Sequence, residues 1–156
     1  IDIIPEFNLY EEFWKIYTKT DIIPPQYISA EAVVERSIIG EGSEIHGEVY
    51  NSVIGPGVVI KKGSVVRNSI IMKQSFIGEN VTVGNNVVMG VGEDVPNKEK
   101  PSVYSFGLVT IGENSVIPAD VRIGINTAIV GETTPEDYPD GELASGETLN
   151  KEGETA

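Results

Sequence analysis

The sequence predicts a mainly β protein, and more narrowly a parallel β-helix in which the chain winds in stacked coils. Two observations carry this prediction. Aliphatic residues recur every six positions in four runs, and a glycine directly follows seven of these thirteen residues. The thirteen positions are Ile39, Ile45, Ile54, Ile60, Val66, Ile71, Ile77, Val83, Met89, Ile111, Ile117, Ile123 and Ile129, and the glycines are Gly40, Gly55, Gly78, Gly84, Gly90, Gly112 and Gly124.

Strand geometry explains the six-residue repeat. Each repeat supplies a short extended segment whose aliphatic side chain points inward, then a corner where glycine or asparagine tolerates a positive φ. Three repeats close a triangular turn of about 18 residues, and successive turns stack about 4.8 Å apart. A motif of coil length agrees, because Arg36-Ser-Ile-Ile, Asn51-Ser-Val-Ile and Asn68-Ser-Ile-Ile recur at spacings of 15 and 17 residues. We therefore expect Asn51 and Asn68 to lie above one another. The hand of the coil does not follow from composition, but a resemblance to the hexapeptide class, whose known members wind left-handed, implies a left-handed coil against the usual right-handed crossover preference.

Three segments are expected along the chain. Residues 1–30 form a junction, in which the capping-box spacing of Asn8 and Glu11 predicts a short α-helix over residues 8–18, with aromatic side chains that dock on the β-helix or on a neighbouring domain. Residues 31–131 form the β-helix, with a loop inserted at about 91–108. Residues 132–156 form an acidic, partly flexible tail, because residues 131–156 hold eight acids and one base.

Composition narrows the class of protein. A chain of 156 residues is long enough for one domain with its own core. The net charge of -13 disfavours nucleic acid and anionic membranes as partners, and no apolar run is long enough to cross a bilayer. The absence of cysteine and of a visible signal peptide suits a cytoplasmic protein. Because the chain starts at Ile1 without an initiator methionine, we expect it to be a piece of a longer polypeptide.

Two stretches resemble a known family. The segment from Asn8 to Thr18, followed by Pro24-Pro25-Gln-Tyr-Ile, resembles the junction between the catalytic and β-helix domains of glucose-1-phosphate adenylyltransferases, also called ADP-glucose pyrophosphorylases. The asparagine-serine repeats and the segment from Glu113 to Gly124 look like the carboxy-terminal coils of the same family. The resemblance implies a nucleotidyltransferase that makes ADP-glucose and pyrophosphate from ATP and glucose 1-phosphate, for glycogen or starch synthesis.

The same resemblance implies that catalysis and regulation belong to different domains of the enzyme. The catalytic domain, with its phosphate loop and the Mg²⁺ that it binds, would lie outside this chain, so we assign no catalytic residue, metal ligand or cofactor here and expect the chain alone to be inactive. The β-helix domain would contact its own catalytic domain, join subunits into a tetramer and help to bind a phosphorylated metabolite as allosteric effector. The candidate effector-binding residues are Arg36, Lys61, Lys62, Arg67 and Lys73, with Lys98 and Lys100 on the loop.

The chain also departs from the family's pattern. Glu113 stands where plant enzymes carry an effector-binding lysine, and the stretch from Glu132 replaces the arginine-rich terminus of enteric bacterial relatives. Surface ion pairing also competes with the effector role, since Lys62 lies at coil spacing from Glu79 and Glu48.

Three other functions stay open. A hexapeptide acyltransferase would use a histidine base, and His46 is the single histidine. The chain could also belong to a non-catalytic paralogue with a structural or regulatory role. A third alternative is another sugar nucleotidyltransferase with a β-helix tail, such as one for guanylyl or uridylyl transfer.

Overall fold

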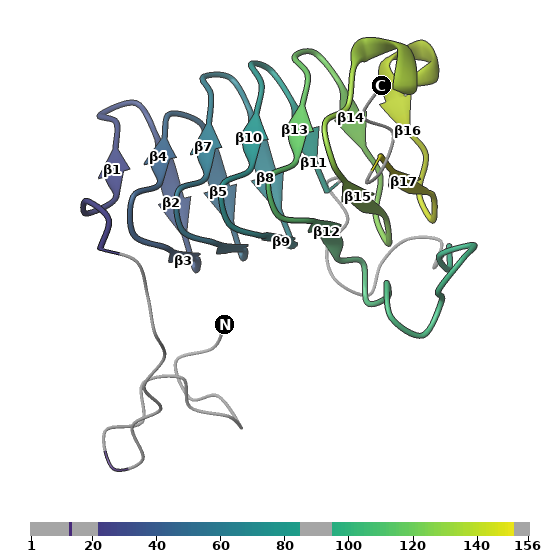
Figure 1. Ribbon diagram of the computed structural model, residues 1–156, viewed down its shortest axis with the longest axis horizontal. Helices are drawn as coiled ribbons and strands as arrows, with labels where there is room; N and C mark the ends of the chain where they lie inside the picture. The colour runs from purple at the N-terminus through teal and green to yellow at the C-terminus, as the bar shows by residue number, and fades with distance from the viewer. Residues whose placement is uncertain (1–12, 14–21, 85–94, 152–156) are drawn as a thin grey trace.

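Three parallel β-sheets wrap around a common axis in the computed structural model, which describes residue 13 and residues 22–84 and 95–151. Figure 1 shows the strands of successive coils side by side along this axis, with β1 at one end and β16 and β17 at the other. The chain visits the three sheets in rotation and the paired strands run parallel. The predicted fold class, a parallel β-helix of six-residue repeats, is confirmed.

Each face of the prism is one sheet. The first sheet contains β1 (Tyr27–Ile28), β4 (Glu44–Ile45), β7 (Val59–Ile60), β10 (Phe76–Ile77) and β13 (Val116–Ile117). The second sheet contains β2 (Val33–Glu35), β5 (Glu48–Tyr50), β8 (Val65–Arg67), β11 (Thr82–Val83), β14 (Arg122–Ile123) and β16 (Glu142–Leu143). The third sheet contains β3 (Ile38–Ile39), β6 (Val53–Ile54), β9 (Ser69–Ile71), β12 (Val109–Ile111), β15 (Ala128–Val130) and β17 (Thr148–Asn150).

The core lies along the axis and consists of the residues that the repeat predicts. Twelve of the thirteen predicted aliphatic positions fall on described residues, and eleven of the twelve are buried. The exception is Ile39, which is half-buried because it belongs to the first coil and packs against a neighbouring coil on one side only. Met89 lies outside the described residues. Burial of this column is the main source of stability, at roughly 1.5–3 kcal/mol for each side chain before entropy is subtracted.

The corner between the second and third sheets shows why asparagine recurs at coil spacing. Arg36, Asn51 and Asn68 all have φ of 46°, in the left-handed region that asparagine adopts more readily than most residues. The Nδ2 of Asn51 donates to the Oδ1 of Asn68 at 2.8 Å. The predicted stacking of these two residues is therefore confirmed, and their amides bridge two coils.

The limits of the β-helix differ from the expected ones at both ends. At the N-terminal end, β1 (Tyr27–Ile28) pairs with β4 and so belongs to the β-helix, although it lies within the expected junction of residues 1–30. At the C-terminal end, Leu143 pairs with Ile123 and Leu149 pairs with Ile129, so residues 132–150 add another coil where a tail is expected. Two 3-10 turns, η1 (Pro135–Asp137) and η2 (Pro139–Gly141), precede β16 and lengthen this coil to 20 residues, against 17 between β8 and β11. The extra residues take Leu143 out of the six-residue rhythm. The helix expected over residues 8–18 lies outside the described residues, apart from Phe13.

Tyr138 closes the C-terminal end of the core. Its side chain is buried in the same cluster as Ile117 and Leu143, and its hydroxyl lies 2.7 Å from the Oγ1 of Thr133. Burial raises the pKa of the Tyr138 hydroxyl to about 12. Lys151 pairs with Asp137 at 2.8 Å and lowers the pKa of that carboxyl, which fixes the turn that carries Tyr138.

The raised pKa of Tyr138 predicts that the free energy of unfolding falls at alkaline pH. Unfolded Tyr138 ionises near pH 10, whereas the folded residue stays protonated to about pH 12, so its contribution is complete below pH 10 and declines by up to about 1.4 kcal/mol per pH unit between these values. Tyr138→Phe removes this component. Urea unfolding of the wild type and of Tyr138→Phe at pH 9 and pH 11 measures this component. If the two proteins differ in free energy of unfolding by the same amount at both pH values, the prediction is contradicted.

Candidate functional site

The five predicted effector-binding residues lie on three different corners of the prism. Arg36 and Arg67 share the corner between the second and third sheets, because Glu35, Tyr50 and Arg67 are in register and Arg36 follows Glu35. Lys61 and Lys62 follow β7 at the corner between the first and second sheets. Lys73 follows β9 at the remaining corner. The structure thus forms pairs from the predicted set and does not bring all five together.

Arg36 and Arg67 form what we call the arginine corner, where Arg67 contacts an aromatic ring. Arg36 and Arg67 are two coils apart, which is about 10 Å along the axis. The Arg67 guanidinium lies 4.7 Å from the centroid of the Tyr50 ring, where a cation is stabilised by the ring face. The Tyr50 hydroxyl donates to the Glu48 carboxylate at 2.9 Å, and this hydrogen bond raises the pKa of Tyr50 above 10. Tyr50 is therefore a fixed neutral platform for the Arg67 charge.

Neighbouring side chains satisfy the three lysines. Lys73 pairs with Glu113 at 3.2 Å, and the Lys61 ammonium lies 5.7 Å from the centroid of the Phe76 ring. Lys62 pairs with Glu31 at 2.6 Å, which raises the pKa of the lysine and lowers the pKa of the glutamate. These ion pairs are exposed, so each contributes little to stability.

The partner of Lys62 is not one of the two that coil spacing suggests. Spacing points to Glu79 or Glu48, but the lysine reaches Glu31, two coils away. The intervening coil crosses this corner at Gly47, whose carbonyl accepts a hydrogen bond from the N–H of Val33 at 3.3 Å. A Cβ at Gly47 would lie 2.3 Å from the carbonyl oxygen of Ser64, so only glycine fits there.

His46 lies on the same corner as Lys61. Its ring is tilted against Tyr27 with centroids 5.7 Å apart, and its Nε2 is 3.7 Å from a Glu44 carboxylate oxygen. Both neighbours belong to the first sheet of this chain. Within the described part of the chain, no three histidine or acidic side chains converge as a metal site, and no helix has the length and hydrophobicity to cross a membrane.

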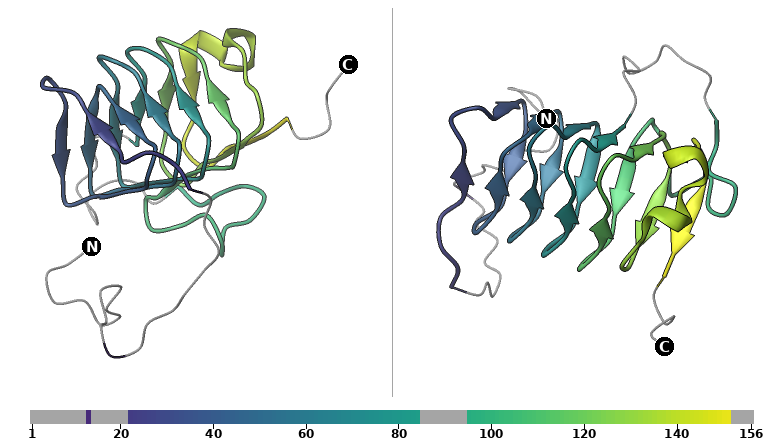
Figure 2. Two further views of the ribbon diagram at one scale, coloured as in Figure 1. Left: turned by 60° about the vertical axis from the view of Figure 1, so that its left-hand side comes forward. Right: turned by 90° about the horizontal axis from the view of Figure 1, so that it is seen from above.

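A second candidate site is the inserted loop, of which residues 95–108 are described; we call this segment the strap. The insertion separates β11 from β12, so that Ile70 pairs with Thr110, 40 residues later. Figures 1 and 2 show the strap outside the prism, next to the C-terminal strands. It is the only described segment of this length that leaves the coils.

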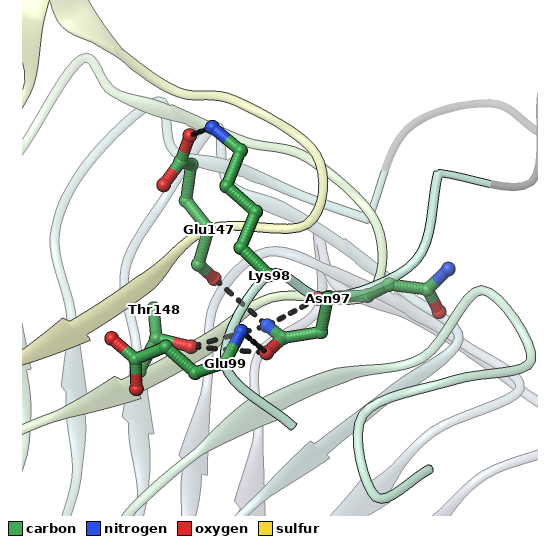
Figure 3. Close-up of polar contacts among 6 residues, drawn as sticks. Asn97, Lys98, Glu99, Glu147 and Thr148 are labelled. Carbon is green, nitrogen blue, oxygen red and sulfur yellow. Dashed lines mark hydrogen bonds and ion pairs between the residues drawn. The ribbon is translucent and has the colours of Figure 1, made fainter. Parts of the chain in front are cut away.

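Buried Asn97 anchors the start of the strap, as Figure 3 shows. Its Nδ2 donates to the carbonyl of Asn126 at 3.0 Å and to the Oγ1 of Thr148 at 3.1 Å. Its Oδ1 accepts from the backbone N–H groups of Glu99 and Lys100, at 3.0 and 2.8 Å. One side chain therefore joins the strap to two neighbouring coils.

Asn126, which belongs to a coil, forms two further hydrogen bonds with the strap. Its Nδ2 donates to the carbonyl of Val95 at 2.9 Å, and its Oδ1 accepts from the N–H of Gly107 at 2.8 Å. Lys98 forms an ion pair with Glu147 at the surface of the same contact. The sequence analysis missed both asparagines. Asn126 has a left-handed backbone like the other corner asparagines, but nothing in the sequence marks Asn97 as its partner.

Stacked six-residue repeats around an aliphatic axis define a hexapeptide-repeat β-helix domain. The chain belongs to the family described as GlmU-like, C-terminal hexapeptide, which it matches over residues 23–100. The resemblance to glucose-1-phosphate adenylyltransferases is confirmed. The chain is 65% identical to the enzyme of that name from Lachnospira eligens over an alignment of 165 positions. It is 41% identical to that of Acetivibrio thermocellus over 166 positions and 52% identical to that of Thermotoga maritima over 155.

These matches include almost all of this chain and a minor part of each relative. They cover 99%, 99% and 92% of the chain but 39%, 39% and 37% of the three relatives. The chain thus spans about two fifths of the length of the curated relatives that it matches.

Proposed function

We propose that this chain is the carboxy-terminal domain of a glucose-1-phosphate adenylyltransferase, a cytoplasmic enzyme that makes ADP-glucose for glycogen synthesis. The similarity to enzymes of that name over nearly the whole chain supports this proposal. The nucleotide chemistry, with the Mg²⁺ that it requires, belongs to the remainder of the polypeptide. The domain itself holds copies together and binds a phosphorylated effector.

Association of copies has a physical basis in the first coil. Among the described residues, its strands β1, β2 and β3 each pair with a neighbour on one side only, and a strand edge without a neighbour leaves backbone groups available for pairing. Tyr27 and Ile28 on β1 are exposed large apolar residues, whereas Tyr138 fills the opposite end of the core. The full-length enzyme is accordingly proposed to be a homo-oligomer, a tetramer, with the first coil as a contact.

The observation that carries the effector proposal is the position of Arg36. The same corner holds asparagine in the next two coils, and all three residues have φ of 46°. A left-handed backbone disfavours arginine relative to asparagine, so turn formation does not explain Arg36. Arg67 lies on the same corner, and guanidinium groups match phosphate oxygens in geometry and charge. We therefore assign the effector phosphate to the arginine corner.

Arg36→Asn tests this assignment without breaking the corner, since it introduces the residue found at Asn51 and Asn68. In the full-length enzyme, we expect the effector concentration for half-maximal activation to rise at least about 10-fold, as loss of roughly 1.4 kcal/mol of charge-assisted hydrogen bonding implies. Activity is measured at increasing concentrations of the candidate effectors, which are sugar phosphates, AMP and pyruvate. Lys62→Ala is the control, because Lys62 already pairs with Glu31. An activation curve that Arg36→Asn leaves unchanged would refute the assignment.

A further inference from the structure

Among the described strands, only those of the third sheet direct no charged side chain outward. The outward residues of this sheet form one row in register, which we call the third face: Ile38, Val53, Ile70, Thr110, Ala128 and Thr148. The corresponding row of the second sheet includes Glu48, Arg122 and Glu142, and that of the first sheet includes Glu44. A row without charge is unusual in a chain that has 24 acidic residues and a net charge of -13.

The fold already covers one end of the third face. Asn97 of the strap donates to the Oγ1 of Thr148 at 3.1 Å, and Ala128, the neighbour of Thr148 in the row, is only 1% exposed although it points outward. The other end is uncovered, since Val53 and Ile70 are each 37% exposed. Apolar side chains that lie together on an exposed surface indicate a contact site.

The chain enters the β-helix beside this uncovered end. A Cβ at Gly42 would lie 3.2 Å from the Cδ1 of Ile23, so Ile23 packs at the corner that joins the third sheet to the first. The 21 residues that precede Ile22 are therefore attached at the margin of the third face. Two coil spacings, about 10 Å, separate Ile38 from Ile70, and four extended residues span about 13 Å.

Residues 8–18 have the composition to cover an apolar surface. Phe13, the one described residue of this segment, is 97% exposed, so its ring offers apolar area that docking would remove from water. Two other aliphatic residues, Leu9 and Ile16, recur with Phe13 at the spacing of one helix face. Six of the eleven residues are aliphatic or aromatic: Leu9, Tyr10, Phe13, Trp14, Ile16 and Tyr17.

We propose that residues 8–18 dock on the uncovered end of the third face, over Val53 and Ile70. The connection through the chain favours this occupant over a separate molecule. A segment that a few residues join to its binding surface has an effective concentration of about 1 mM or more, which a separate partner must reach in solution. Docking on the third face is independent of the proposed function, because the segment and the face belong to the same chain.

Trp14 reports this docking, because it is the single tryptophan of the chain. In the 156-residue chain, its fluorescence should peak at a shorter wavelength than in the urea-unfolded chain, as for an indole removed from water. Ile70→Glu should shift the peak to the wavelength of the unfolded chain and raise acrylamide quenching to the unfolded level, with the circular dichroism of the coils unchanged. Glutamate suits an outward position, since Glu48 occupies one in the row of the second sheet.

Two further variants test the face and the segment separately. Val65→Glu places the same charge on the second sheet and should leave Trp14 emission unchanged, whereas Phe13→Ser lies outside the coils and should act like Ile70→Glu. Equal shifts in Val65→Glu and Ile70→Glu refute the choice of face. A wild-type Trp14 that already emits as in urea refutes the docking and leaves the third face to a partner outside this chain. A wild-type shift that disappears on dilution refutes it in favour of a second copy.

Discussion

Replacing Ile71 with alanine is expected to lower the free energy of unfolding by about 2–5 kcal/mol, the range for large-to-small substitutions in a core. Ile71 is 1% exposed and stacks between Ile54 and Ile111. The coils on either side are held at a fixed spacing by their backbone hydrogen bonds, such as that from Met72 to Ile111 at 2.8 Å. Collapse of the cavity is therefore limited, and the loss should fall in the upper part of the range. Equilibrium unfolding in urea measures it.

The neighbouring residue provides a matched control. Ile70 is in the same strand and has the same side chain, but it points outward and is 37% exposed. Ile70→Ala leaves no internal cavity and is expected to cost roughly 1 kcal/mol. Similar losses for the two variants would contradict the inward and outward alternation on which the fold description depends.

The coils could be predicted because their signals are local. An aliphatic residue every six positions, followed by a corner residue that tolerates positive φ, repeats the same choice in each coil, and Asn51 and Asn68 stack as their spacing indicates. The last coil breaks this rule. The segment with η1 and η2 inserts extra residues before β16. Leu143 therefore joins the buried core, and Leu149 packs against it, although neither lies at a multiple of six residues from Ile129 or Ile123.

The candidate sites were harder to predict, since their pairings connect residues far apart in sequence. Asn97 contacts Thr148 only because the insertion folds back onto the C-terminal coils. Lys62 reaches Glu31 across the coil that contains Gly47, a pairing that joins corners two coils apart. A list of basic residues could identify Arg36 and Arg67 as candidates. It could not show that Lys62 and Lys73 are already paired.

Asn97→Ala is expected to destabilise the strap and the last coil together. The substitution leaves the N–H groups of Glu99 and Lys100 and the carbonyl of Asn126 without their amide partner. Loss of several hydrogen bonds in one buried network should cost roughly 2–4 kcal/mol. Because a solenoid transmits stability mainly between neighbouring coils, the loss should be local.

Hydrogen exchange can locate this effect along the chain. In Asn97→Ala, amides of residues 97–108 and 146–150 should exchange faster, including that of Lys98, which donates to the carbonyl of Gly146 at 2.8 Å. Amides between β4 and β10 should keep their protection. Lys98→Ala is the control, since it removes only the surface ion pair with Glu147 and should cost about 0–1 kcal/mol. Uniform acceleration across all coils, or an equal effect of the two variants, would show that Asn97 does not act as the anchor of the strap.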